Sequence, residues 1–387
     1  MGQSNAEITT QELETLLEKY IEKSHNLSYA LKIVGHPGIG KSALVKQVAT
    51  KKKYLFIDTR LAFKENVDLG GYPIPNHKSK QMIYFRPKFI PPLSVPKGKK
   101  GIVWFLDEAN RAHPSVIQTL FQIITEQTCG EHKLPPQTAI ILAGNLGEED
   151  DTVITNFNDS ALKGRLASFH LKPNLPEWLI WAVKEKIHPV IIKYLSCYPE
   201  KLWDENNIDP NPRGWHQVSD TIKHLYQAPT EKKLKVHLEK KDSESLTKII
   251  SSLIGQITAH EFLKEINHPR QITTQNILDG DKEKILNLKK NKVPLEDFLW
   301  AISGAISYLR EKNIESKNKL SSSELKKLSH TLYFISLART DARLSFFYLL
   351  IKKSSLFTQI PLALKLIKPL DLKNQIIKNL NSFWTEV

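Results

Sequence analysis

The sequence predicts an α/β fold: a parallel sheet with helices on both faces, followed by a mostly α-helical region. Three observations support this prediction. Short apolar runs suited to buried strands alternate with segments of helical periodicity. The first of these runs leads into a glycine-rich loop and then a helix, the order that a phosphate loop requires. Beyond Pro173 the strand patterns stop, and most later segments have helical spacing.

The expected elements follow in chain order. Residues 9–21 are expected to form a helix, because Thr9 and Glu12 make a capping box ahead of one apolar stripe. Residues 61–100 are rich in proline and are expected to be irregular. The strands expected in the sheet are residues 30–34, 54–58, 101–106, 138–143 and 168–171. Helices are expected at residues 178–195 and 218–226.

Residues 35–42 read GHPGIGKS and fill every fixed position of the phosphate-loop pattern G-x-x-x-x-G-K-[ST]. The glycines allow the backbone N–H groups to turn inward, where the dipole of the following helix also favours an anion. Lys41 is expected to reach the β- and γ-phosphates, and Ser42 to ligate Mg²⁺. The expected nucleotide contacts in this loop are Gly35, His36, Pro37, Gly38, Ile39, Gly40, Lys41, Ser42 and Ala43.

A second motif, VWFLDE at residues 103–108, is an apolar strand that ends in two carboxylates. A buried parallel strand delivers its last residues to the carboxyl edge of the sheet, where ligands bind. Asp107 is expected to hold the Mg²⁺ shell and Glu108 to polarise an attacking water. Together with the phosphate loop, this motif predicts binding and hydrolysis of ATP.

The composition predicts a cytoplasmic protein without membrane insertion. The chain has 387 residues, a net charge of +14 and two cysteines far apart in sequence, which fits a reducing compartment. No apolar run approaches the length of a membrane span. Residues 231–387 carry 27 Lys and Arg against 17 Asp and Glu. Solvated helix faces explain this excess, and contact with nucleic acid is the alternative.

Three segments resemble the MoxR-type AAA+ ATPases, and more broadly the dynein-related branch of AAA+ proteins. They are VWFLDEANRA at 103–112, AGN at 143–145 and DSALKGRLASFHL at 159–171. Ala109 stands where the family usually has isoleucine. Asp68, Gly71 and Pro73 match the Asp-x-x-Gly-x-Pro pattern of the family.

The resemblance implies three further roles. Asn145 would be the sensor-1 residue that orients the lytic water, with a turn-forming asparagine as the alternative. Arg165 would be the arginine finger, although Gly164 and Leu166 replace the usual Asp and Phe around it; otherwise it is an exposed basic residue. Arg213 would be the sensor-2 arginine of a helical lid, or else a surface arginine beside a tryptophan.

The resemblance also implies a domain plan and a job. Residues 1–172 would be the ATPase core, 173–228 a small helical lid and 229–387 a helical C-terminal region. A finger acting on a neighbour implies a closed ring, a hexamer, that remodels a protein client in a chaperone-like way; such clients often carry a von Willebrand A domain. The alternatives are a nucleic-acid-acting motor or restriction-type NTPase, and a nucleotide-gated scaffold with little turnover.

Two insertions in the core have no role in ATP hydrolysis itself. Residues 126–139 are expected to form a hairpin, and residues 68–92 bring aromatic and basic side chains. Both segments either contact the client or cover sheet edges.

Overall fold

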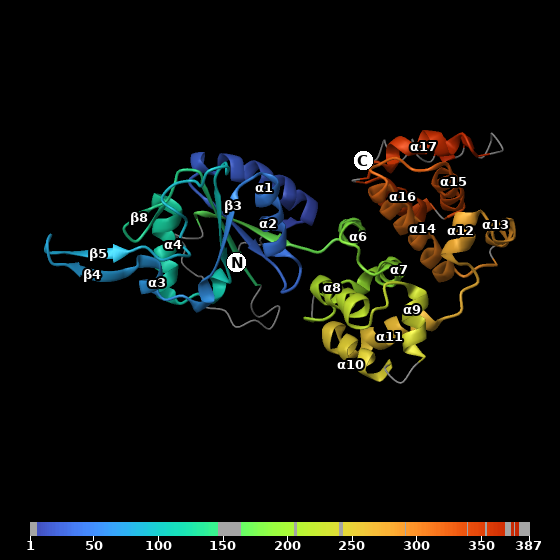
Figure 1. Cartoon of the computed structure of the whole chain (residues 1–387), viewed down its shortest axis with the longest axis horizontal. Helices are drawn as coiled ribbons and strands as arrows, with labels where there is room; N and C mark the ends of the chain where they lie inside the picture. The colour runs from blue at the N-terminus through green and yellow to red at the C-terminus, as the bar shows by residue number, and fades with distance from the viewer. Residues whose placement is uncertain are drawn as a thin grey trace. The chain divides into compact units, whose positions relative to one another are not determined.

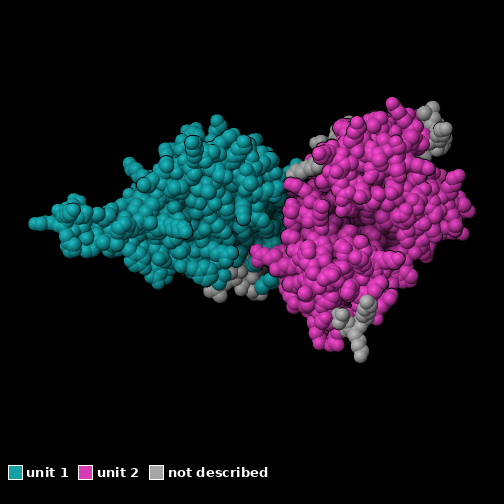
Figure 2. Space-filling model, viewed as in Figure 1, with its two compact units in different colours: residues 1–174, 205–208 teal, residues 175–204, 209–387 magenta. Residues whose placement is uncertain are grey.

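The computed structural model describes residues 6–145, 164–204, 207–239, 243–290, 292–338, 340–352, 354–367, 373–374 and 376–378. The chain divides into two compact units (Figure 2). The first comprises residues 1–174 and 205–208, and the second comprises residues 175–204 and 209–387.

The first unit is built on a parallel sheet (Figure 1). Within the described residues its strands lie in the order β1-β10-β2-β9-β6-β3, and every adjacent pair is parallel. The bounds in that order are Ala6–Ile8, Leu166–Leu171, Ala30–Val34, Thr138–Gly144, Ile102–Asp107 and Leu55–Arg60. All five expected strands are present, with ends shifted by at most two residues. The short edge strand β1 was not expected, because three residues give too little pattern to recognise.

Helices cover both faces of the sheet. Ile33, Phe105 and other side chains of one face pack against α1 (Thr10–Lys23) and α2 (Lys41–Lys51). Trp104, Leu106 and their neighbours on the other face pack against α4 (Pro114–Glu126). Since successive residues of a strand point to opposite faces, one apolar strand such as β6 supplies both cores. The expected fold class is confirmed, and α1 begins at the expected capping box of Thr9 and Glu12.

The expectation that residues 61–100 are irregular is wrong in part. This stretch contains α3 (Asn66–Gly70) and an antiparallel hairpin of β4 (Tyr72–Asn76) and β5 (Gln81–Phe85). The hairpin extends from the body of the first unit (Figure 1). β7 (Thr128–Cys129) and β8 (His132–Lys133) form a second, smaller hairpin. It lies within residues 126–139, where a hairpin was expected.

Within its described residues, the second unit consists of helices joined by loops. The helix expected over residues 178–195 is two helices, because Pro189 starts a new one with His188 as its N-cap. Residues 218–226 belong to the end of α8 and the π-helical turn after it. The helices are α6 Leu175–Lys184, α7 Pro189–Cys197, α8 Pro212–Asp220, α9 Glu231–Leu238, α10 Ser243–Ile254, α11 Gln256–Asn267, α12 Thr274–Asp279, α13 Lys282–Lys289, α14 Leu295–Glu315, α15 Ser322–Ser336, α16 Thr340–Ile351 and α17 Leu356–Leu364.

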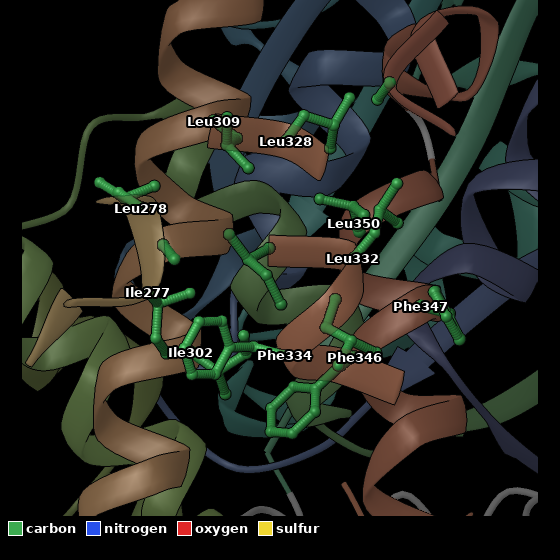
Figure 3. Close-up of a cluster of buried hydrophobic side chains, with 14 of the residues drawn as sticks. Ile277, Leu278, Ile302, Leu309, Leu328, Leu332, Phe334, Phe346, Phe347 and Leu350 are labelled. Carbon is green, nitrogen blue, oxygen red and sulfur yellow. The ribbon is translucent and has the colours of Figure 1, made fainter. Parts of the chain in front are cut away.

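Two hydrophobic clusters stabilise this unit. One joins α6 to α11 around Trp215 and Phe262, and it includes side chains on both sides of residue 228. The other lies among α12 and α14 to α17 (Figure 3). The division into a lid and a C-terminal region at residue 228 stays a prediction. Among the described residues, no helix is both long and apolar enough to span a membrane.

Candidate functional site

The glycine-rich loop connects β2 to α2, as its sequence predicts. Gly38 and Gly40 have φ values of 82° and 97°, which favour glycine because other residues are strained there. A Cβ atom on Gly35 would lie 2.8 Å from the backbone oxygen of Leu171. His36 is buried, and Ile39 packs against the core under α1 and α2. The loop conformation therefore depends on these glycines, and it leads directly into the amino end of α2.

Lys41 follows this loop as the first residue of α2 and is only 8% exposed. Its Nζ donates to the backbone oxygens of Gly35 and His36, at 2.5 and 3.0 Å. It also donates to Oδ1 of Asn145, at 3.1 Å. The loop lysine and the expected sensor residue are therefore in direct contact, although 104 residues separate them in sequence.

The sheet brings three groups of candidate residues to the carboxyl ends of its strands. In β2, β9 and β6, which are neighbours, Val34 lies opposite Gly144 and Leu142 lies opposite Leu106. The phosphate loop, Asn145 and the pair Asp107–Glu108 each follow one of these strands at its carboxyl end. This edge of a parallel sheet is the usual place for a ligand.

Glu108 has a strained backbone. Its φ and ψ are 54° and 35°, the left-handed region, which costs a residue with a side chain roughly 1 kcal/mol or more. Its N–H donates to Oδ1 of Asp107 at 2.9 Å, and its Oε2 lies 3.9 Å from Nη1 of Arg111. The left-handed turn ends β6 at Asp107, so Glu108 does not continue the strand.

Asp58 joins this pair of carboxylates from the neighbouring strand β3, in which Arg60 pairs with Asp107. Partial burial raises the pKa of the Asp58 carboxyl, and the negative charge of Asp107 raises it further. Asp58 was missed from the sequence, where it was only the last residue of an apolar run. The alignment of the two strands was the missing information.

Asn110 was also missed, and it holds Asn145 in place. Its Nδ2 donates to the backbone oxygen of Asn145 at 2.7 Å, and its Oδ1 accepts from the N–H of Asn145 at 3.2 Å. Asn110 is buried, and a Cβ on the neighbouring Gly144 would lie 2.7 Å from its Oδ1. The residue therefore ties the segment after Glu108 to the end of β9.

The protein groups suit a magnesium ion that arrives with a nucleotide. Among the described residues, no three His, Cys, Asp or Glu side chains are grouped as they would be in a metal site made by protein alone. Ser42 begins α2 beside Lys41, and Asp107 ends β6 at the same sheet edge. One hydroxyl and one carboxylate, completed by phosphate oxygens and water, are typical donors for Mg²⁺.

Arg165 lies at the amino ends of the strands, opposite the carboxyl ends that carry the other candidate residues. It directly precedes β10, whose first residue Leu166 pairs with Ala30 at the start of β2. Its backbone oxygen accepts from the N–H of Ala30, and its guanidinium lies 5.6 Å from the ring centre of Phe121. β2 has five residues, and each adds about 3.3 Å to the length of the strand. The backbone of Arg165 therefore lies roughly 15 Å from the phosphate loop of its own chain.

Arg213 belongs to the second unit, where it is exposed in the first turn of α8. Asn211 caps this helix by accepting from the N–H of Gly214. The sensor-2 role of Arg213 stays a prediction. Residues 159–163, part of the segment that resembles the AAA+ family, lie outside the described residues.

No protein-family model matches the chain, and no curated protein matches it in sequence. Solved structures with a related arrangement include NtrX from Brucella abortus in complex with ADP, at 15% identity and a TM-score of 0.32, covering 86% of this chain and 69% of that chain. Another is the Holliday junction branch migration motor RuvB from Thermotoga maritima, at 13% identity and a TM-score of 0.31, covering 72% and 76%.

Proposed function

We propose that this protein is a Mg²⁺-dependent ATPase. The observation that supports this most directly is the convergence of three features at one sheet edge. These are a glycine-rich loop with its lysine, an asparagine bonded to that lysine, and two consecutive carboxylates at a strained turn. Phosphoryl transfer to water uses groups of these three kinds.

The chemistry assigns a role to each residue. The loop N–H groups and Lys41 hold the phosphates, so that Lys41 exchanges its bonds with Gly35 and His36 for phosphate oxygens. Glu108 accepts a proton from the attacking water, and Asn145 orients that water. Mg²⁺, held by Ser42 and Asp107, would neutralise negative charge on the phosphates.

We further propose that the chain works as a closed ring, a hexamer of the MoxR type, that remodels a protein client. The position of Arg165 supports assembly, because its backbone lies at the amino ends of the strands, away from the phosphate loop of its own chain. We infer that it acts at the site of a neighbouring subunit. There it would stabilise charge that develops on the phosphoryl group. A von Willebrand A domain protein remains the client that the family resemblance favours.

The test is steady-state ATP turnover and nucleotide binding by two isosteric variants. Glu108→Gln removes the base and should lower kcat by about 10² to 10⁴ while ATP still binds. Asp107→Asn should instead weaken binding of Mg²⁺-ATP relative to ATP in EDTA. Turnover by Glu108→Gln at the wild-type rate would contradict the proposed mechanism.

A further inference from the structure

The hairpin β4–β5 presents apolar side chains to solvent on both of its faces. Tyr72 and Phe85 are 63% and 61% exposed, and they share one face with the pair Ile74 and Ile83. The opposite face carries the cross-strand pairs Pro73–Tyr84 and Pro75–Met82. A two-stranded hairpin is marginal in water and gains nothing from exposed apolar faces. This surface is therefore suited to covering by a partner.

The hairpin is fixed at its base. Gly70 and Gly130 pack so closely that a Cβ on Gly130 would lie 2.9 Å from the Cα of Gly70. Sγ of Cys129 donates to the backbone oxygen of Leu69 at 3.2 Å. Because β7 follows α4, these contacts connect the hairpin to the helix that begins just after Glu108 and Asn110.

The two edges of the hairpin differ. Pro73 and Pro75 remove two backbone donors from β4, which closes that edge to a further strand. β5 contains no proline, and within the described residues it pairs only with β4. Proline has no N–H, so it fits the antiparallel pairs in which the two residues do not hydrogen-bond to each other. Pro73–Tyr84 and Pro75–Met82 are pairs of this kind. The N–H groups of Met82 and Tyr84 therefore point away from β4, to the outer edge of β5. The outer edge of β5 is therefore able to accept a strand.

Every charged residue in this stretch of the chain is basic. Residues 69–106 contain seven Lys and Arg and no Asp or Glu. Lys78 and Lys80, in the hairpin turn, and Lys88, just after β5, are exposed. An extended segment that pairs with β5 would meet these cations, so its charged residues should be acidic.

We propose that the outer edge of β5 binds an extended, acidic polypeptide segment by strand addition. Its apolar side chains would cover the hairpin faces, and its carboxylates would meet Lys78 and Lys80. The inference rests on the proposed function, because it defines the chemistry of the client. A free N–H edge fits a peptide and not a nucleic acid, because a nucleic acid has no backbone strand to pair with it.

The experiment measures fluorescence anisotropy of a labelled peptide of alternating glutamate and valine with the full chain. Lys78→Glu/Lys80→Glu should weaken binding by about tenfold or more at low salt, and the difference should shrink as salt is raised. The matched control is Lys232→Glu/Lys233→Glu on α9, which changes net charge equally at exposed sites and should bind as the wild type does. Met82→Pro, which removes an outward donor, should also weaken binding, whereas Met82→Leu should not.

Three results would overturn the proposal: equal binding of a lysine–valine peptide, no loss in the Lys78/Lys80 variant, or tighter binding of a single-stranded oligonucleotide. Thermal unfolding of each variant separates lost docking from lost folding. Binding is also measured with Lys41→Ala, which should not turn over ATP. If the protein binds the peptide but does not hydrolyse ATP, the docking site is supported and the proposed ATPase function fails. If it hydrolyses ATP but does not bind the peptide, only the docking site is refuted.

Discussion

Asn110 shows how a single residue can position a site without touching the reacting atoms. Its two hydrogen bonds to the backbone of Asn145 hold that residue beside Lys41. We expect Asn110→Ala to lower kcat by about 10- to 100-fold, because a buried amide pair loses both partners and Asn145 shifts. Nucleotide affinity should change by less than about threefold, since the phosphate loop is untouched. Stopped-flow nucleotide binding and steady-state turnover measure the two quantities.

Asn66→Ala is the control for this substitution. Asn66 accepts from Oγ1 of Thr119 at 2.7 Å, so the variant also removes an asparagine hydrogen bond next to α4. Its kcat should stay near that of the wild type. An equal loss of affinity and kcat in Asn110→Ala would show that the residue only supports folding.

Among single residues, the sequence predicts those that act together with their immediate neighbours in the chain. The phosphate loop could be predicted because its glycines and lysine act within eight consecutive positions. Asp58 and Asn110 could not, because they reach the site through the alignment of β3 with β6 and through contact with β9. Asn110 lies within the segment that resembles the AAA+ family, but neither its contact with β9 nor the alignment of Asp58 can be read from the sequence.

Among the elements, α7 depends on a histidine that is buried in its neutral form. His188 caps the helix by accepting from the N–H of Val190, and its Nε2 lies 3.0 Å from the backbone oxygen of Ala228. Burial lowers the pKa of His188 to about 4. An unfolded chain binds the proton near pH 6.5, so folding stability from this group is complete above pH 6.5 and is lost as pH falls towards 4. The full loss is about 3 kcal/mol.

Urea unfolding at a series of pH values tests this prediction. His188→Asn keeps a capping side chain but removes the titrating group, so the variant should lose less stability than the wild type between pH 6.5 and 4. Parallel curves for the two proteins would mean that His188 takes up its proton equally well when folded.

The β4–β5 hairpin depends on a glycine at its base. Gly71 has a φ of 88°, and a Cβ there would lie 2.5 Å from the backbone oxygen of Phe85. Gly98 has a similar φ of 83° but no atom within 4 Å of its Cβ position. Gly71→Ala should therefore destabilise the protein by about 1–3 kcal/mol more than Gly98→Ala does, because only Gly71 combines strain with a clash. Calorimetry of both variants gives the comparison, and equal losses would refute the predicted clash.

The elements also show which patterns are reliable. Continuous apolar runs predicted the central strands, since burial on both faces leaves a strong signal. The β4–β5 hairpin was instead expected to be irregular, because two prolines among the five residues of β4 favour a loop. A strand with one free edge tolerates them, and nothing in the local sequence says that an edge is free.

For the whole molecule, the separation of Arg165 from its own phosphate loop predicts shared active sites. Lys41→Ala and Arg165→Ala should each abolish most turnover. An equimolar mixture of the two should regain activity, because some sites then combine an intact loop with an intact arginine from a neighbour. Turnover is measured across protein concentration, with mass determined in parallel. A mixture as inactive as its components, in a confirmed mixed assembly, would show that Arg165 does not act between subunits.

The prolines of β4 also bear on how the protein behaves at high concentration. Two copies could meet through their β5 edges, and the joined sheet would then present only proline-bearing edges. Such a contact stops at a pair and cannot grow into a stack of sheets. The chain can therefore expose an apolar hairpin without seeding fibrils, and replacing both prolines with valine would remove that protection.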